Sequence, residues 1–179
     1  MYKILIALAA TAAMATAPVY AAMDKNAYKS TKKQIDDTFK TDKANCKSLK
    51  ANAKDVCMAE AKAKQKIAKA DAEADYKNTD KERTAARKTR ADAEYSVAKE
   101  KCDDQKGNAK DVCIKEAKAA RVAGKADATA DKKVKDARTD AKEDKRDAEY
   151  KVAVEKCDAM NADAKSRCVK DAKARFGKT

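Results

Sequence analysis

The sequence predicts an all-α protein: an elongated antiparallel coiled coil of helical hairpins, with three disulfide-stapled helix-turn-helix repeats. Six cysteines recur in evenly spaced pairs, and helix breakers are rare, with three glycines and one proline. Ala, Lys, Arg, Glu and Gln, which favour helices, make up much of the chain. Large apolar side chains are too few for an ordinary globular core, which leaves helices packed along an Ala-rich seam or a disordered basic chain. The repeats and turn signals described below favour the helices.

The N-terminus has the pattern of a secretory signal peptide. Lys3 precedes an apolar run over residues 4–17, and small residues lead to a cleavage site near Ala21. The run is too short to span a bilayer, which needs about 20 residues. We therefore expect residues 1–21 to be a signal peptide, and residues 22–179 to form a single elongated helical repeat region in the periplasm. No later segment is apolar enough to be transmembrane.

The cysteine pairs define three repeats, each with a hairpin turn near residue 51, 107 or 162. An even number of cysteines in an exported chain indicates disulfides. Six cysteines formally allow 15 pairings, but partners at similar distances from a turn lie opposite each other. A bridge there closes a loop of about 12 residues and contributes roughly 3 kcal/mol. The expected bridges join Cys46 to Cys57, Cys102 to Cys113 and Cys157 to Cys168.

Each turn carries signals for the start of a new helix. Asn52, Asn108 and Asp163 are favoured N-cap residues, so we expect them to cap the second arm of each hairpin. The residue before each cap is expected to be left-handed and to end the preceding helix, and Gly107 suits this role better than Ala51 and Ala162.

Few signals interrupt the helices between the turns. The expected helices cover residues 24–50, 53–106, 109–161 and 164–175. A second capping box begins near Asn78, and Gly124 is a further weak point. If the helices break at both positions, three shorter hairpins result. If they break at neither, the molecule is a long antiparallel rod, which is the arrangement we favour.

Large and small side chains recur in register with the cysteines. An aromatic residue stands two helical turns before the first cysteine of each pair, so both lie on one helix face. An alanine follows each second cysteine by four residues, which lets the two arms approach closely. The aromatic residues are Phe39, Tyr95 and Tyr150, and the alanines are Ala61, Ala117 and Ala172.

The sequence offers no constellation for catalysis. Histidine is absent, which removes the commonest general base and metal ligand. A zinc site built from cysteines requires closer spacing than these pairs have. We therefore expect no enzyme activity, no metal and no cofactor.

The net charge of +13 is the sequence property that says most about possible binding partners. Basic residues are dense over residues 62–69, 81–90 and 132–145, although the last of these stretches also carries four acids. The plainest interpretation is a solvated surface that keeps the rod in solution. A sharper one is attraction to lipopolysaccharide, anionic lipid, or acidic or unfolded proteins. We expect no nucleic acid partner for an exported chain, whereas a seam this thin makes a homo-oligomer possible.

The segment Gly107–Cys113, followed by Glu116–Ala119, resembles a group of Ala- and Lys-rich exported proteobacterial proteins with repeated cysteine hairpins. Some of these are labelled as cell-envelope proteins similar to TolA, whose long central helix has a comparable composition. The resemblance implies an envelope location and helical character, and we carry over no TolA mechanism.

Three functions follow as hypotheses. The first is a non-enzymatic structural or interaction protein of the cell envelope, a basic helical rod that binds anionic components. The second is a periplasmic holdase chaperone that grips unfolded clients along its apolar seam. The third is a hydrophilin-like protein that protects against stress.

Overall fold

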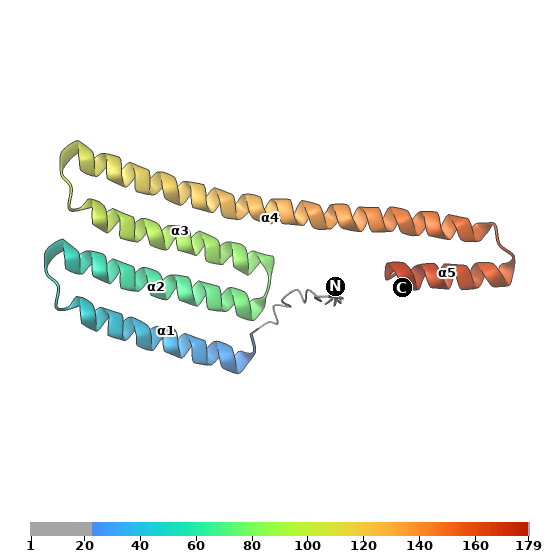
Figure 1. The fold of residues 1–179 in the computed structure, drawn as a ribbon, viewed down its shortest axis with the longest axis horizontal. Coiled ribbons are helices and arrows are strands. Elements are labelled where there is room, and N and C mark those ends of the chain that lie inside the picture. Colours follow the sequence, from blue (N-terminus) through green and yellow to red (C-terminus); the bar gives the residue numbers. More distant parts are fainter. Residues whose placement is uncertain (1–22, 179) are drawn as a thin grey trace, which may run out of the picture.

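The computed structural model describes residues 23–178, which form five helices and no strands (Figure 1). The expected signal peptide, residues 1–21, lies outside the described residues. The all-α prediction is confirmed. The helices are α1 (Lys25–Cys46), α2 (Ala51–Lys77), α3 (Asp80–Cys102), α4 (Gly107–Asp158) and α5 (Ala162–Phe176).

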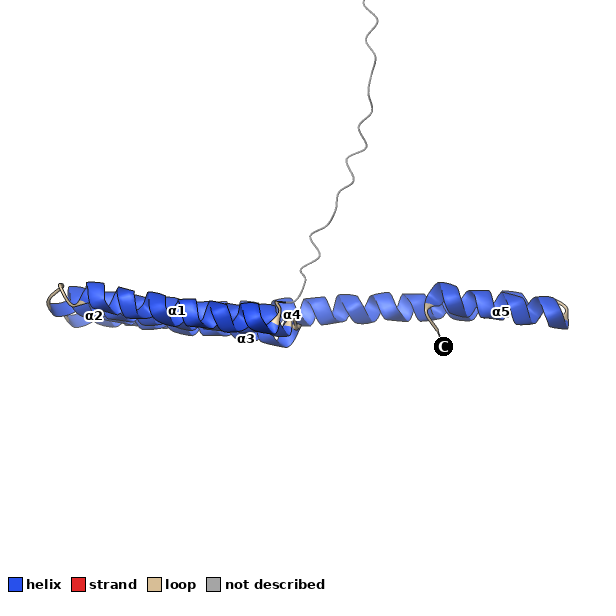
Figure 2. Ribbon diagram, turned by 90° about the horizontal axis from the view of Figure 1, so that it is seen from below, coloured by secondary structure: helices blue, strands red, loops and turns tan. Residues whose placement is uncertain are grey.

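The helices form a flat layer in which each packs only on its neighbours in the sequence. α1, α2, α3 and the first half of α4 lie side by side, and the edge-on view shows that the layer is one helix thick (Figure 2). The second half of α4 extends beyond the layer, and α5 folds back against its end (Figure 1). At about 1.5 Å per residue, the 52 residues of α4 span about 78 Å.

The favoured unbroken helix over residues 53–106 is wrong, because the chain reverses at Asn78. This residue adopts a left-handed backbone with φ of 49°, which a short polar side chain tolerates. Thr79 then caps α3: its hydroxyl accepts from the amide nitrogen of Glu82 at 3.2 Å and donates to the Glu82 carboxylate at 2.6 Å. The reversal turns one long helix into α2 and α3.

The helix does not break at Gly124, the second weak point, so α4 stays continuous. Gly124 lies inside the helix, and a Cβ placed on it would stand 3.2 Å from the Cβ of Ala91 on α3. This glycine therefore serves close packing between helices. When the repeats are aligned on their second cysteines, the positions of Asn78 and Thr79 are taken by Val134 and Lys135, which supply neither a left-handed residue nor a cap.

The core of the described residues consists of small side chains. Within residues 23–178, alanines and the first cysteine of each bridge supply all the buried side chains except that of Phe176, and no polar or charged side chain is buried. Alanine lets helix axes approach closely, but each buries little apolar area. The three disulfides therefore matter more to stability here than they would in a domain with a leucine-rich core.

Candidate interaction surface

The closed end of each hairpin carries the expected disulfide. The pairs Cys46–Cys57, Cys102–Cys113 and Cys157–Cys168 have Cα–Cα distances of 5.6, 5.7 and 5.7 Å. The described residues contain no free cysteine. The cysteines therefore act as structural staples, which leaves no thiol there for redox chemistry.

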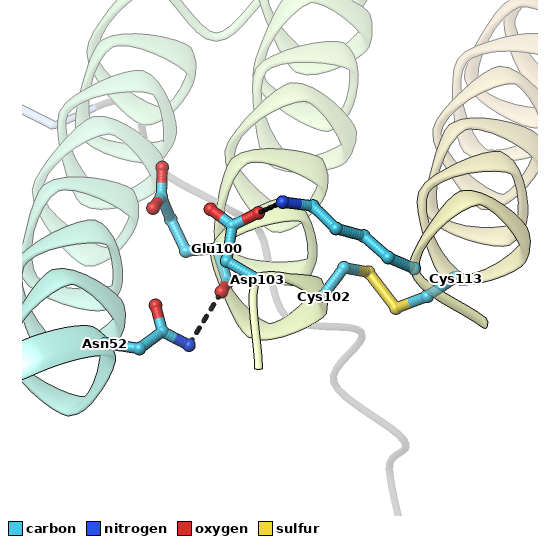
Figure 3. The surroundings of a disulfide bond; sticks show 6 residues. Asn52, Glu100, Cys102, Asp103 and Cys113 are labelled. Atoms are coloured by element: carbon cyan, nitrogen blue, oxygen red, sulfur yellow. Dashed lines mark hydrogen bonds and ion pairs between the residues drawn. A yellow bond between two sulfur atoms is a disulfide. The ribbon is translucent and has the colours of Figure 1, made fainter. Parts of the chain in front are cut away.

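Polar contacts surround the middle staple (Figure 3). Lys110 pairs with Asp103 across the turn at 2.8 Å, and the repeat-related Lys165 pairs with Asp158 at 3.0 Å. The Asn52 side chain donates to the main-chain oxygen of Glu100 at 3.1 Å and so ties the start of α2 to the end of α3. These contacts hold the turns against the neighbouring helices.

The three predicted N-caps are wrong. Lys50 and Lys106 occupy the cap positions of α2 and α4 without a side-chain hydrogen bond, and Asn52 and Asn108 lie inside the helices. At α5 the cap is Asn161, which accepts from the amide nitrogen of Ala164 at 3.1 Å, while Asp163 lies in the first helical turn.

The cause lies in the backbone of the turns. Ala51 and Gly107 are left-handed as expected, with φ of 48° and 54°. However, they open the second helix of each hairpin instead of ending the first, so each helix starts earlier than predicted. Ala162 is not left-handed, and this third turn uses a polar cap instead.

A row of aspartates, which the sequence analysis missed, links the two arms of each hairpin. Asp36, Asp92 and Asp147 each stand three residues before the repeated aromatic residue. Asp36 accepts from Gln65 at 2.7 Å and pairs with Lys69 at 2.6 Å, and Asp147 pairs with Lys178 at 2.5 Å. Aligning the three aromatic residues would have revealed this row.

Asp92 makes the densest of these links. It binds Arg121 and also Lys125, whose Nζ lies 3.1 Å from both carboxylate oxygens. Desolvation raises the pKa of Asp92, but hydrogen bonds from Arg121 and Lys125 lower it by more, so it lies below its ordinary value. The ionised form is therefore the one that joins α3 to α4.

This link predicts a pH dependence of stability. A carboxyl group whose pKa is lowered in the folded state contributes stability fully above its unfolded value, about 3.9, and loses it as pH falls through the folded value. We expect D92N to lower the thermal midpoint at pH 7, and this difference to disappear in strong acid. D140N is the control, since Asp140 is exposed and has no ion-pair partner among the described residues. An equal effect of both variants at pH 7 would contradict the prediction.

The repeated aromatic residues have three different surroundings. Phe39 and Ala61 line a hollow of about 220 Å³ between α1 and α2, together with Ile35 and Ala68. Arg121 lies over the Tyr95 ring at 5.3 Å. Tyr150 packs edge-on against Phe176, with ring centroids 6.1 Å apart. The expected approach of aromatic and alanine is thus best seen in the first hairpin.

The basic stretches differ in how far nearby acids neutralise them. Several cations in the first two stretches pair with acids on a neighbouring helix, as Arg90 does with Asp71 at 2.8 Å. The middle of α4, between the layer and α5, has no neighbouring helix (Figure 1). There Arg138, Lys142 and Arg146 follow one another at one per turn and are exposed. We call these three residues the basic row.

The described residues contain no group of three His, Cys, Asp or Glu side chains that could hold a metal ion. No helix within residues 23–178 combines the length and apolarity needed to cross a membrane. The chain matches no protein family, no curated protein and no solved structure.

Proposed function

We propose that this protein is a non-enzymatic component of the cell envelope, a basic, elongated helical protein that binds anionic surfaces such as lipopolysaccharide phosphates or anionic lipid headgroups. The basic row on α4 is the observation that carries the proposal. Arg138 and Lys142 have no ion-pair partner among the described residues, and Arg146 reaches Glu143 only at 3.7 Å. These cations are therefore available to external anions.

The geometry supports contact with an extended surface. The basic row lies on a stretch of single helix that bridges the layer and the C-terminal hairpin (Figure 1). The three cations line one open hollow together with Glu143 and Glu149, and an array of phosphates can approach all three side chains from its open side. Attraction of this kind weakens as salt rises, because the Debye length falls from about 30 Å at 0.01 M to about 10 Å at 0.1 M.

The test is binding to lipopolysaccharide and to vesicles with anionic headgroups at low salt. We expect R138Q/K142Q/R146Q to weaken binding several-fold. The control K101Q/K110Q/K165Q removes the same charge from lysines already paired with acids, so it should weaken binding less. Absence of binding by the native chain at low salt, or equal losses in both variants, would contradict the proposal.

A periplasmic holdase chaperone is the second candidate, favoured by the hollow between α1 and α2. Its apolar lining includes Ile35 and Phe39, which an extended apolar side chain of an unfolded client could contact. A holdase should delay aggregation of an unfolded outer-membrane protein at equimolar ratio, and F39S should lose this effect. Unchanged aggregation with the native chain would exclude this candidate.

A further inference from the structure

The side of α4 that faces away from α3 and α5 is an open edge of the molecule (Figure 1). Small apolar side chains follow this edge for most of the helix and are all exposed, the three valines at 44, 50 and 55%. Many recur at intervals of 11 residues, which keeps them in line on one side of a helix. We call this row the outer seam: Val112, Ala119, Ala123, Ala126, Ala130, Val134, Ala137, Ala141, Ala148 and Val152.

The first half of the outer seam repeats a surface that is covered elsewhere in the same chain. Alignment on the second cysteines matches α2 to the first half of α4. Ala63 and Ala74 are buried in α2, and Ala63 lines one hollow with Ala93 of α3. Their counterparts on α4 are Ala119 and Ala130, which are exposed. The surface that α3 covers on α2 is thus left uncovered on α4.

The second half of the outer seam repeats the opposite side of that interface. Alignment on the first cysteines matches α3 to the second half of α4. Ala86 and Ala93 are buried in α3, whereas their counterparts Ala141 and Ala148 are exposed. One straight helix therefore carries both surfaces of the α2·α3 interface. These surfaces cannot meet within the chain, because α4 lacks the turn formed by Asn78.

Residues of the same charge as those that form the ion pairs of the α2·α3 interface recur at the matching positions of α4. In α2·α3, Asp71 pairs with Arg90 and Glu60 with Lys101, both at 2.8 Å. The counterparts on α4 are Asp127 with Lys145, and Glu116 with Lys156. Asp127 and Lys145 lie about 27 Å apart along one helix, at 1.5 Å per residue, so they cannot pair within one chain. None of these four has an ion-pair partner within residues 23–178.

We propose that a second copy of this chain docks antiparallel along the outer seam and recreates the α2·α3 interface twice. The first half of each α4 would cover the second half of the other. Asp127 would then meet Lys145 of the partner subunit, and Glu116 would meet Lys156 of the partner subunit. Both pairs have the same midpoint, residue 136, as a single two-fold axis requires. α3 and α5 lie on the other side of α4 and leave this edge free (Figure 1).

Cross-linking through single added cysteines tests the arrangement. Ala137 lies one residue from the axis, so A137C should give a disulfide-linked dimer on mild oxidation. A126C is the matched control: it lies on the same seam, but its two copies would be separated by about 30 Å at 1.5 Å per residue. Equal cross-linking of both variants would indicate parallel or random association and would overturn the proposal.

Charge reversal followed by sedimentation equilibrium gives an independent test. The native chain should be dimeric, and D127K or K145D should each raise the dissociation constant by about tenfold, because like charges replace two ion pairs. The double variant D127K/K145D should restore the native value, since both pairs are then present with reversed sign. A monomeric native chain, or a double variant as weak as the single ones, would overturn the proposal.

Discussion

Removal of the third staple by C157A/C168A is expected to unfold α5 while the layer of α1 to α4 stays folded. α5 has only 15 residues and packs on α4 alone. Helices this short are marginal in water without support. Loss of a bridge that closes a loop of about 12 residues removes roughly 3 kcal/mol in the chain-entropy model. The remaining contacts, chiefly those of Phe176 and Lys178, are too few to replace it.

Amide hydrogen exchange measures this effect segment by segment. Protection of residues 162–176 should be lost in C157A/C168A, with little change in α2 and α3. The matched control is C102A/C113A, because α3 is also held by α2 on its other side. In that control the whole layer should lose stability, but no single helix should unfold alone. Full protection of α5 without its bridge would show that packing on α4 suffices.

Enlargement of Ala128, the most buried alanine, should destabilise the layer. Ala128 is fully buried, with no measurable exposure, on the face of α4 that packs against α3. A128L must push α3 and α4 apart, and overpacking of this kind typically costs about 1–3 kcal/mol. In the same helix, A120L adds the same atoms at an exposed position and should stay within about 0.5 kcal/mol of the native chain.

Urea unfolding of the two variants checks this prediction. A lower midpoint for A128L with an unchanged slope would show lost stability without a change in the surface exposed on unfolding. If A128L were as stable as A120L, the alanine core would tolerate larger side chains. The close approach of α3 and α4 would then not be a requirement of the fold.

The sequence was most informative where covalent spacing and turn chemistry act locally. Equal distances from each turn led to the three disulfides, and the capping box at Asn78 was visible although the unbroken rod was preferred. Whether the helix breaks at Asn78 depends on two free energies. One is gained when α2 packs against α3, and the other is gained when the backbone hydrogen bonds of a continuous helix are kept. Amino-acid composition does not show which of these free energies is larger. It also does not show that Gly124 lets α4 pack closely on α3 instead of breaking the helix.

The sequence was less informative where the outcome depends on contacts between repeats. The caps were misplaced because left-handed Ala51 and Gly107 allow the second helix to start earlier than polar residues alone suggest. The links through Asp36 and Asp92 join residues that are well separated along the chain, so no local sequence signal indicates them. Alignment of the repeats contains this information, and it also reveals the outer seam.

The alanine core has a thermal consequence. The heat capacity change on unfolding comes mainly from newly exposed apolar surface, and it sets the curvature of the stability curve. A core of methyl groups and disulfides exposes less apolar surface per residue than one built from leucine and phenylalanine. The heat capacity change should therefore fall below the usual 12–15 cal/mol/K per residue. Stability would then vary little with temperature, and cooling would weaken this fold less than it weakens a globular domain of equal length.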